Sequence, residues 1–258
     1  MVKIGVPLRY SHLDGNRPIL FLGERVRRCL QKAGAIVIPI VQVQDVDYAD
    51  TEFDQFEELT LEEKKEIDDY LDMVDGVFFP GGNKVTPFDQ YLLERCIDKD
   101  IPTLGVCLGM QLMSCYKEAF KVYETDSYIN HCQEDDFILS HKVIVKKDSL
   151  LYRIIGEKEI MVNSFHHYHV SENPFYEISA VSEDGYIEAI EKKDKIFHLG
   201  VQWHPEISYD FDENSRKIID SFLDVCLKNG HCNKEKWKNV IKITKSCQFL
   251  VDKIRFYA

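Results

Sequence analysis

The sequence lacks any apolar run approaching the roughly 20 residues that a membrane helix needs, and its 258 residues show no internal repeat. Basic residues are also scarce: 32 Lys and Arg stand against 44 Asp and Glu, which gives a net charge of -12. Nucleic acids and anionic membranes are bound by clustered cations, so we expect neither as the main partner. The first ten residues, MVKIGVPLRY, show no n-region and no long apolar run, so we expect no secretory signal.

Cys-x-x-Cys pairs are absent as well, although the sequence has eight cysteines. Without a secretory signal, these are expected to be reduced thiols in a cytoplasmic protein, most of them buried as small hydrophobic side chains. The sequence also has no Gly-x-x-x-x-Gly-Lys loop, which would indicate an ATP-binding synthetase domain. What is present is the composition of a folded globular protein, 45% hydrophobic and 29% charged.

The order of the apolar segments predicts an α/β fold built on a parallel sheet. Residues 2–6 form a β-branched run typical of a buried strand, and residues 20–33 carry apolar positions at helical spacing. Residues 35–40 form a second strand, which completes a β-α-β unit of the kind found in parallel sheets. Residues 8–18 are polar and contain glycine and proline, so we expect a loop there.

The rest of the chain continues the alternation of strands and helices. Thr60 and Glu63 form a Thr-x-x-Glu capping box, which predicts a helix over residues 61–73. Further helices are expected at 87–99, from 108 to about 116 and at 215–227, and further strands at 77–79, 103–106, 143–145, 178–181, 187–190 and 196–201. We therefore predict one domain over residues 1–227, followed by a tail of unknown role over residues 228–258.

The segment Gly105-Val106-Cys107-Leu108-Gly109 has the form Gly-x-Cys-x-Gly, at the point where a predicted strand gives way to a helix. A sharp turn there raises the thiol above the sheet edge, and the flanking glycines relieve crowding around it. The N-terminus of the following helix favours the reactive thiolate, and the N–H of Leu108 can point at a developing oxyanion. The alternative is a buried structural cysteine, which the flanking strand and helix disfavour.

Two more strand ends carry groups that such a cysteine would need. Gly81-Gly82 ends one predicted strand, and because backbone can approach a ligand closely there, the N–H of Gly82 is the natural second oxyanion donor. His204-Pro205-Glu206 ends another, and in an extended segment Glu206 projects to the same side as His204 and can orient it as a general base. Taken alone, the first motif fits an ordinary turn and the second a chance sequence in a loop.

The three motifs fall at three separate strand ends, in the order oxyanion glycine, nucleophile, and base with its orienting carboxylate. Active sites of open parallel sheets form at the carboxyl ends of the strands. Together the motifs predict a cysteine-nucleophile amidohydrolase with Cys107, His204 and Glu206 as its catalytic triad, and Gly82 and Leu108 as oxyanion donors.

At these residues the sequence resembles the class I glutamine amidotransferase superfamily. Residues 80–82, 105–111 and 200–206 are similar to its three signature blocks, and the resemblance covers roughly residues 2–227. It implies that residues 1–227 form a catalytic domain of that kind, a flavodoxin-like three-layer α/β sandwich with a mostly parallel central sheet. It also implies a γ-glutamyl thioester on the cysteine and no metal or organic cofactor.

Within the superfamily the sequence is most similar to the peptidase C26 branch, typified by γ-glutamyl-γ-aminobutyrate hydrolase. Trp203, the Asn-Ser-x-His-His block at residues 163–167 and the Gly-Gly-x-x-Val-x-Pro pattern at residues 81–87 are similar to that branch. The sequence departs from it at Tyr168, where glutamine is usual, and at Leu108, where arginine is frequent. A Pro-x-x-Tyr motif is also lengthened, and these departures leave the identity of the departing amine open.

The resemblance further implies which residues hold the α-amino and α-carboxylate groups of a glutamyl substrate. Exposed amides and side-chain donors suit a carboxylate. The implied substrate-binding residues are Gln111, Ser164, Phe165, His166 and His167.

Two segments have the residue types of a metal site but not its spacing. The acidic segment at residues 45–66 does not resemble a calcium loop, so we expect a solvated surface, and its spacing does not show whether it covers the active site. His166, His167 and His169 lie close together in the sequence, but no fourth ligand at a suitable spacing is evident. The sequence therefore predicts no metal site.

The predicted activity is hydrolysis of a γ-glutamyl amide, with a small γ-glutamyl molecule as the partner. One alternative is a glutaminase subunit that passes ammonia to a separate synthetase. A second is a non-catalytic, flavodoxin-like domain that acts in binding or regulation. A third, a folate polyglutamate hydrolase, has the same triad chemistry but is disfavoured by the doubled histidines and the lack of a signal peptide. A homo-oligomer stays open under each of these hypotheses.

Overall fold

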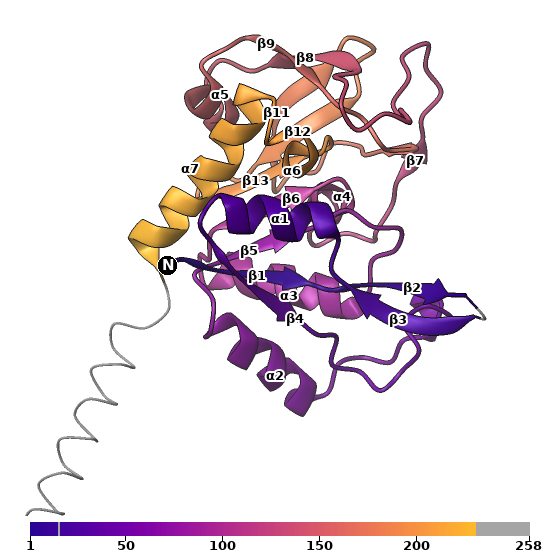
Figure 1. Ribbon diagram of the computed structural model, residues 1–258. Helices are drawn as coiled ribbons and strands as arrows, with labels where there is room; N and C mark the ends of the chain where they lie inside the picture. Colours follow the sequence, from indigo (N-terminus) through magenta and orange to yellow (C-terminus); the bar gives the residue numbers. More distant parts are fainter. Residues whose placement is uncertain (15, 231–258) are drawn as a thin grey trace, which may run out of the picture.

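The computed structural model describes residues 1–14 and 16–230, and a nine-stranded sheet forms the centre of this part of the chain (Figure 1). The strands of this sheet are β1 (Lys3–Pro7), β4 (Ile36–Ile40), β5 (Gly76–Phe79), β6 (Thr103–Val106), β8 (His141–Val145), β9 (Glu159–Val162), β11 (Glu177–Ser182), β12 (Ile187–Glu191) and β13 (His198–Val201). Shorter pairings involve β2 (Arg9–Leu13), β3 (Arg17–Phe21), β7 (Tyr123–Glu124) and β10 (Tyr168–His169). The helices are α1 (Glu24–Lys32), α2 (Leu61–Leu71), α3 (Pro87–Asp98), α4 (Leu108–Ser114), α5 (Leu150–Ile155), α6 (Pro205–Ser208) and α7 (Glu213–Asn229), with a 3-10 turn, η1, at Phe53–Gln55.

The sheet changes from parallel to antiparallel at β13. In the order β4-β1-β5-β6-β13 all neighbours pair in parallel, whereas β12-β11-β8-β9 extend the sheet beyond β13 with antiparallel pairs. Strands β5, β6 and β13 are buried along their whole length, as is usual for parallel strands covered on both faces. The predicted flavodoxin-like α/β fold is confirmed.

Helices cover both faces of the sheet, which gives three layers (Figure 1). α1, α5 and α7 pack on one face, where Leu30 and Phe222 belong to one buried cluster. α2, α3 and α4 pack on the other face, where Ile67, Phe88 and Met113 belong to a second cluster. None of the helices within residues 1–14 and 16–230 has both the length and the apolar character to cross a membrane.

Most predicted elements lie close to their expected positions. Thr60 and Glu63 make both hydrogen bonds of the predicted capping box at the start of α2. α7 ends at Asn229, near the predicted domain boundary at residue 227, and nearly all of the predicted tail lies outside the described residues. The sequence did not predict α5 or β9, because such short elements depend on packing against neighbours more than on local pattern.

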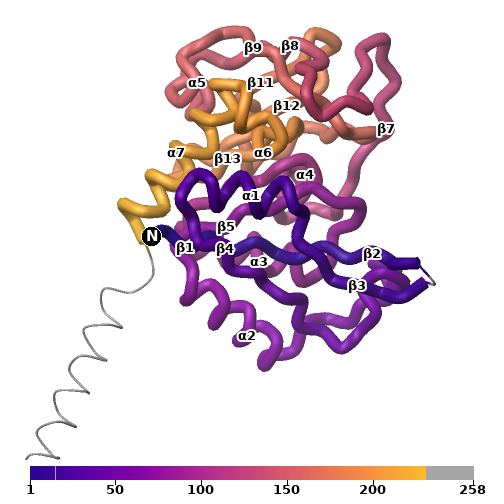
Figure 2. The backbone as a smooth tube through the Cα atoms, in the orientation of Figure 1, coloured from indigo at the N-terminus to yellow at the C-terminus, as the bar shows by residue number. Residues whose placement is uncertain are grey.

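The predicted loop over residues 8–18 is wrong. This segment forms β2 and the first two residues of β3, which pair as an antiparallel hairpin that projects from the edge of the fold (Figure 2). The predicted helix start at residue 20 is also wrong, because Leu20 and Phe21 complete β3 and α1 begins at Glu24. Most of β3 is exposed, so its side chains show no buried alternation from which a strand could be predicted.

The carboxyl ends of β5, β6 and β13 lie side by side. Phe79 at the end of β5 pairs with Gly105 of β6, and Val106 at the end of β6 pairs with Val201 of β13. The segments that leave these three strands therefore start from one edge of the sheet, where ligand sites of α/β folds form. They are the three segments that carry the predicted motifs.

Candidate active site

Cys107 occupies a strained turn between β6 and α4. Its backbone angles are φ 52° and ψ -108°, a region that non-glycine residues rarely adopt and that costs about 1–3 kcal/mol. The strain is held by the surrounding structure: the Cys107 N–H donates to the Val201 carbonyl at 2.9 Å. A Cβ at Gly109 would lie 2.3 Å from the Phe79 carbonyl oxygen, so only glycine lets α4 approach β5 this closely. The predicted role of the flanking glycines thus has a steric basis.

His204 lies between Cys107 and Glu206. Its Nδ1 is 2.7 Å from Glu206 Oε1, and its side chain also hydrogen-bonds to the Cys107 thiol group. Burial disfavours the charged imidazole, but the Glu206 carboxylate and the Cys107 sulfur outweigh it and raise the pKa of His204 well above its usual value. A Cβ at Gly81 would lie 2.9 Å from His204 Cε1 and 3.5 Å from Cys107 Cβ, so this glycine leaves room for the pair. The arrangement can hold a thiolate beside an imidazolium.

The local structure around His204 differs from the predicted extended segment. His204 is the N-cap of α6, and Pro205 occupies the first turn of that helix, where its missing N–H costs nothing. Glu206 therefore reaches His204 across a helical turn rather than along a strand. The two side chains do project together, as predicted, but the backbone between them is helical rather than extended.

Asn163 fixes the backbone of His204, and the sequence did not single it out as a site residue. The His204 N–H donates to Asn163 Oδ1 at 2.8 Å, and Asn163 Nδ2 donates to the His204 carbonyl at 2.8 Å. Asn163 Nδ2 also donates to Ser208 Oγ at 3.1 Å. Asn163 is fully buried, so it acts by positioning the imidazole. Its place in the Asn-Ser-x-His-His block was the only signal in the sequence.

Arg9 of the hairpin holds the glycine loop after β5. Its guanidinium donates to the Pro80 carbonyl at 2.9 Å, to the Gly81 carbonyl at 3.3 Å and to Asp89 Oδ1 at 2.8 Å. In a trans peptide the N–H points opposite to the C=O, so the Gly81 carbonyl facing Arg9 turns the Gly82 N–H away from it. Arg9 and Asp89 are both buried, and this pair was not predicted because Arg9 was expected to lie in a loop.

Replacing Arg9 by methionine is expected to lower the free energy of unfolding by about 3–5 kcal/mol, because buried Asp89 then loses its charged partner. Arg9→Lys keeps the charge but cannot reach all three acceptors, so it should lose activity more than stability. Urea unfolding and glutamate release measure the two effects. Arg27→Met, which removes an exposed ion pair with Glu24, is the control and should leave both nearly unchanged. Equal behaviour of the Arg9 and Arg27 variants would contradict the assignment.

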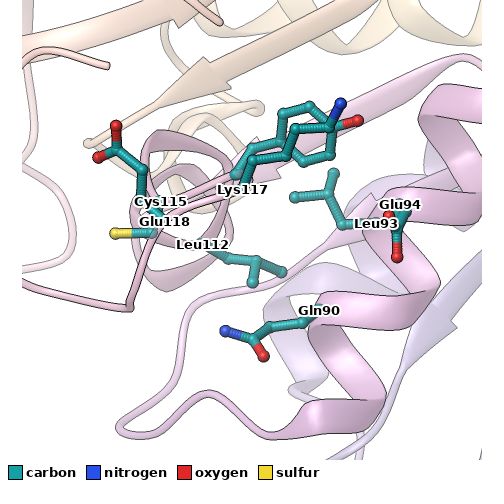
Figure 3. Close-up of a pocket in the computed structure, with 8 residues that line it drawn as sticks. Gln90, Leu93, Glu94, Leu112, Cys115, Lys117 and Glu118 are labelled. Carbon is teal, nitrogen blue, oxygen red and sulfur yellow. The ribbon is translucent and has the colours of Figure 1, made fainter. Parts of the chain in front are cut away.

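A cavity of about 520 Å³ opens above Cys107, within the size range of small-molecule sites. The residues that line it are Gly82, Asn83, Cys107, Leu108, Gln111, Phe120, Val122, Phe165, His166, His167 and Tyr168. No residue of the acidic segment 45–66 is among them, so within the described residues that segment does not line the cavity. A smaller pocket of about 190 Å³ lies between α3 and the far end of α4, lined by residues that include Gln90 and Cys115 (Figure 3).

Not all of the residues expected to bind a glutamyl group line the cavity. Gln111, Phe165, His166 and His167 line the cavity, whereas Ser164 is fully buried behind it. The Ser164 hydroxyl lies 3.2 Å from a buried histidine ring rather than facing the cavity. His166 lines the cavity with its ring, but its Nδ1 faces the Tyr168 carbonyl at 2.9 Å and its Nε2 faces the protein interior. Gln111 and His167 are thus the polar side chains of the set that are best placed for a ligand.

Comparison with known proteins points to one family. The Peptidase C26 family model matches residues 88–206. The glutamine amidotransferase-like protein YvdE of Lactococcus lactis is 30% identical over 194 residues, which cover 64% of this chain and 80% of that protein. The chain belongs to the class I glutamine amidotransferase superfamily, in its peptidase C26 branch.

Relatives of this amidotransferase-like chain include both hydrolases and synthetase subunits. The γ-glutamyl-γ-aminobutyrate hydrolase of Escherichia coli O157:H7 is 26% identical over 199 residues, covering 64% of this chain and 77% of that protein. The matching subunit of the glutamine-hydrolysing GMP synthase of Methanococcus aeolicus is 30% identical over 167 residues, covering 64% and 78%. The family and these relatives support a cysteine-dependent amide hydrolase.

The fold is also similar to solved structures of glutaminase domains. The CTPS glutaminase domain of Trypanosoma brucei with bound acivicin matches with a TM-score of 0.62 at 19% identity, covering 89% of this chain and 95% of that one. At this identity the match establishes the fold of the C26 chain and does not bear on its substrate.

Proposed function

We propose that this protein hydrolyses γ-glutamyl amides through a thioester on Cys107. The observation that carries the proposal is the contact series from the Cys107 thiol through His204 to Glu206, at the floor of a cavity large enough for a small substrate. A regulatory domain without activity would have no need for a cysteine held in a strained conformation beside a charged imidazole. The chemistry needs a reduced thiol, which fits the cytoplasmic location expected from the sequence.

The reaction would proceed in two halves. The Cys107 thiolate attacks the γ-carbonyl carbon, and the N–H groups of Gly82 and Leu108 stabilise the oxyanion. The tetrahedral intermediate collapses to the thioester as His204 gives its proton to the departing amine. His204 then takes a proton from water as the hydroxide attacks the thioester carbon. The C–S bond breaks, glutamate is released, and the Cys107 thiolate is restored beside the protonated His204. Glu206 keeps the imidazole oriented throughout.

Leu108 is suited to the oxyanion role by its place in the fold. It is the first residue of α4, and the first N–H groups of a helix have no acceptor within the helix. The positive end of the helix dipole adds to the attraction for the oxyanion. Gly82 is held on the other side of the thiol by the contacts of Arg9 with the glycine loop.

The residues that line the cavity indicate where the glutamyl group and the amine of the substrate would bind. Asn83, Gln111 and His167 are polar groups available to the glutamyl end. Phe120, Val122 and Tyr168 form an apolar and aromatic wall. No Asp, Glu, Lys or Arg is among the described residues that line the cavity. An amine with an apolar body should therefore be accepted more readily than one that carries a strong charge, because the cavity offers no ion-pair partner to the charge.

The test is glutamate release by the pure full chain from a panel of γ-glutamyl compounds. The panel contains glutamine, γ-glutamyl-γ-aminobutyrate, and γ-glutamyl amides of aliphatic and aromatic amines. We expect release from conjugates at a higher kcat/KM than from glutamine, with the apolar amines favoured. Release from no member of the panel, by a chain whose Cys107 is confirmed to be reduced, would overturn the proposal.

A second candidate function is a glutaminase subunit that delivers ammonia to a separate synthetase. The observation that favours it is the 30% identity to a subunit of the glutamine-hydrolysing GMP synthase. Under this hypothesis glutamine is the preferred member of the panel, and its hydrolysis rises when a synthetase partner is added. Stoichiometric co-purification of a synthetase, together with no glutamate release from the other conjugates, would favour the glutaminase subunit over the stand-alone hydrolase.

A further inference from the structure

Three histidines and a glutamate meet in a buried cluster behind the cavity. The cluster consists of His131 from the loop before β8, His141 at the start of β8, His166 after β9 and Glu188 in β12. All four side chains are buried, and one ligand atom from each lies within 4.8 Å of the others. The sequence showed no further ligand near His166, because the other three members of the cluster lie far from it along the chain.

The distances around Glu188 fit a tetrahedral metal ion. Its Oε1 lies 3.5 Å from His131 Nδ1, 3.7 Å from His141 Nε2 and 3.6 Å from His166 Nε2. Ligands at the usual 2.0–2.1 Å from a tetrahedral zinc ion are about 3.3 Å apart. Small side-chain movements would bring the four atoms to that separation.

Hydrogen bonds on the outer side of each ring direct a lone pair into the cluster. His131 Nε2 lies 2.9 Å from Asp184 Oδ2, and His166 Nδ1 lies 2.9 Å from the Tyr168 carbonyl, so both of these nitrogens carry the proton. His141 Nδ1 faces the Lys142 carbonyl at 3.3 Å in the same way. A carboxylate or carbonyl that holds the outer N–H is the usual arrangement behind a metal-binding histidine.

The inward-facing atoms have no other use in the described part of the chain. His131 Nδ1, His166 Nε2 and both oxygens of Glu188 are buried without a hydrogen-bond partner there. His141 Nε2 has only the Ser164 hydroxyl, at 3.2 Å, a contact that a metal would replace. Burying a carboxylate and several polar nitrogens without hydrogen-bond partners is strongly unfavourable, and a cation bound between them would remove that cost.

We propose that His131, His141, His166 and Glu188 form a structural site for a divalent transition metal, with Zn²⁺ as the ion that fits best. Three imidazoles and one carboxylate suit Zn²⁺ and related ions better than Mg²⁺ or Ca²⁺, which prefer oxygen ligands. The burial of all four ligands leaves no open position, which is typical of structural rather than catalytic zinc. This site shares no residue with the Cys107–His204–Glu206 triad, although His166 also lines the cavity, and it does not depend on the proposed hydrolysis.

The consequence of such a site is the placement of the cavity wall. Neighbours of His166 in the chain, Phe165 and His167, line the cavity, while His141 and Glu188 belong to the antiparallel part of the sheet. A metal would therefore tie the segment after β9 to β8 and β12 and fix the part of the cavity wall that this segment forms. Asp184 supports the site from outside, since it also accepts hydrogen bonds from the hydroxyls of Ser127 and Ser182.

The test is Zn²⁺ binding by the full chain after the metal has been removed with a chelator. We expect one equivalent to bind, and thermal unfolding to shift upward until one equivalent has been added. Glu188→Gln should abolish that upward shift, yet its metal-free form should be no less stable than the wild type, because the substitution removes a buried unpaired charge. Asp184→Asn keeps all four ligands and should weaken binding about 10- to 100-fold.

His169→Gln is the matched control, since His169 lies close in the chain but stacks on Tyr186 outside the cluster. It should bind Zn²⁺ as the wild type does. Co²⁺ in place of Zn²⁺ should give the visible spectrum of a tetrahedral site without thiolate charge-transfer bands, which separates this site from binding by cysteines. Zn²⁺ binding that is equal in the wild type and Glu188→Gln would overturn the proposal, as would thiolate bands or no binding at all. The cluster would then be a buried imidazolium–carboxylate network.

Discussion

Replacing Cys107 by serine is expected to lower kcat for glutamate release by on the order of 10⁴- to 10⁶-fold, the usual loss when a nucleophile is removed. The serine side chain has nearly the shape of cysteine, so the strained turn and the contact with His204 should survive. A hydroxyl is far harder to ionise than a thiol, and the imidazolium that stabilises a thiolate cannot hold an alkoxide at neutral pH. The measurement is single-turnover and steady-state release from the best substrate of the panel.

Cys115→Ala is the control for this prediction. Cys115 lies just beyond the opposite end of α4, and its thiol lines the smaller pocket rather than the cavity. The other buried cysteines are poor nucleophiles for a physical reason: burial raises the pKa of the Cys96 thiol to about 12. Near-normal activity of Cys107→Ser, or an equal loss in Cys115→Ala, would show that the thiol of Cys107 does not form the covalent intermediate.

Replacing Glu206 by glutamine is expected to lower kcat by roughly 10²- to 10⁴-fold and to change its pH dependence. Burial opposes the charge on His204, and the Glu206 carboxylate is the largest influence that raises its pKa. Without that carboxylate the pKa of His204 falls. The alkaline limb of kcat/KM, where the imidazolium loses its proton, should therefore move to lower pH. The profile of each variant, measured between neutral and alkaline pH, checks the shift.

The same substitution has a consequence for stability that can be separated from catalysis. A group whose pKa is raised on folding stabilises the native state below its unfolded pKa, and this contribution is lost as the pH rises through the folded pKa. The His204 contribution in the wild type should thus decline toward alkaline pH, and Glu206→Gln should show little of that decline. In the Cys107→Ser background, Glu206→Gln should cause little further loss of kcat, because residues of one catalytic unit are not additive. Additive losses would argue that Glu206 acts outside the triad.

The sequence was sufficient for the parts of the fold that repeat a simple pattern. β6 was predicted at residues 103–106, where the structure has it, because a buried parallel strand is a short apolar run with clear ends. The Gly-x-Cys-x-Gly motif was readable for a similar reason, since crowding at one turn restricts several neighbouring positions at once. Gly105 and Gly109 flank Cys107 because the fold leaves no room for a side chain at either position.

What the sequence could not predict are contacts between residues far apart in the chain. Arg9, at the start of β2, forms a buried ion pair with Asp89 of α3, and apart from Arg9 the residues of the β2–β3 hairpin are exposed or only half-buried. The cluster of His131, His141 and Glu188 with the histidine after β9 draws on four separate segments, and no local spacing reports it. Polar pairs of this kind depend on the final packing, so they become visible only when the fold is known.

The neighbouring positions of β6 and β13 also determine when in folding the site can exist. The proposed nucleophile follows β6 and the proposed base follows β13, and these strands pair directly although they come from opposite halves of the chain. Contacts between distant segments close late and slowly, because a long loop must be ordered before they form. A chain still emerging from the ribosome therefore holds a cysteine without its base. The proposed triad can therefore assemble only after β13, the last strand of the sheet in the sequence, has paired with β6.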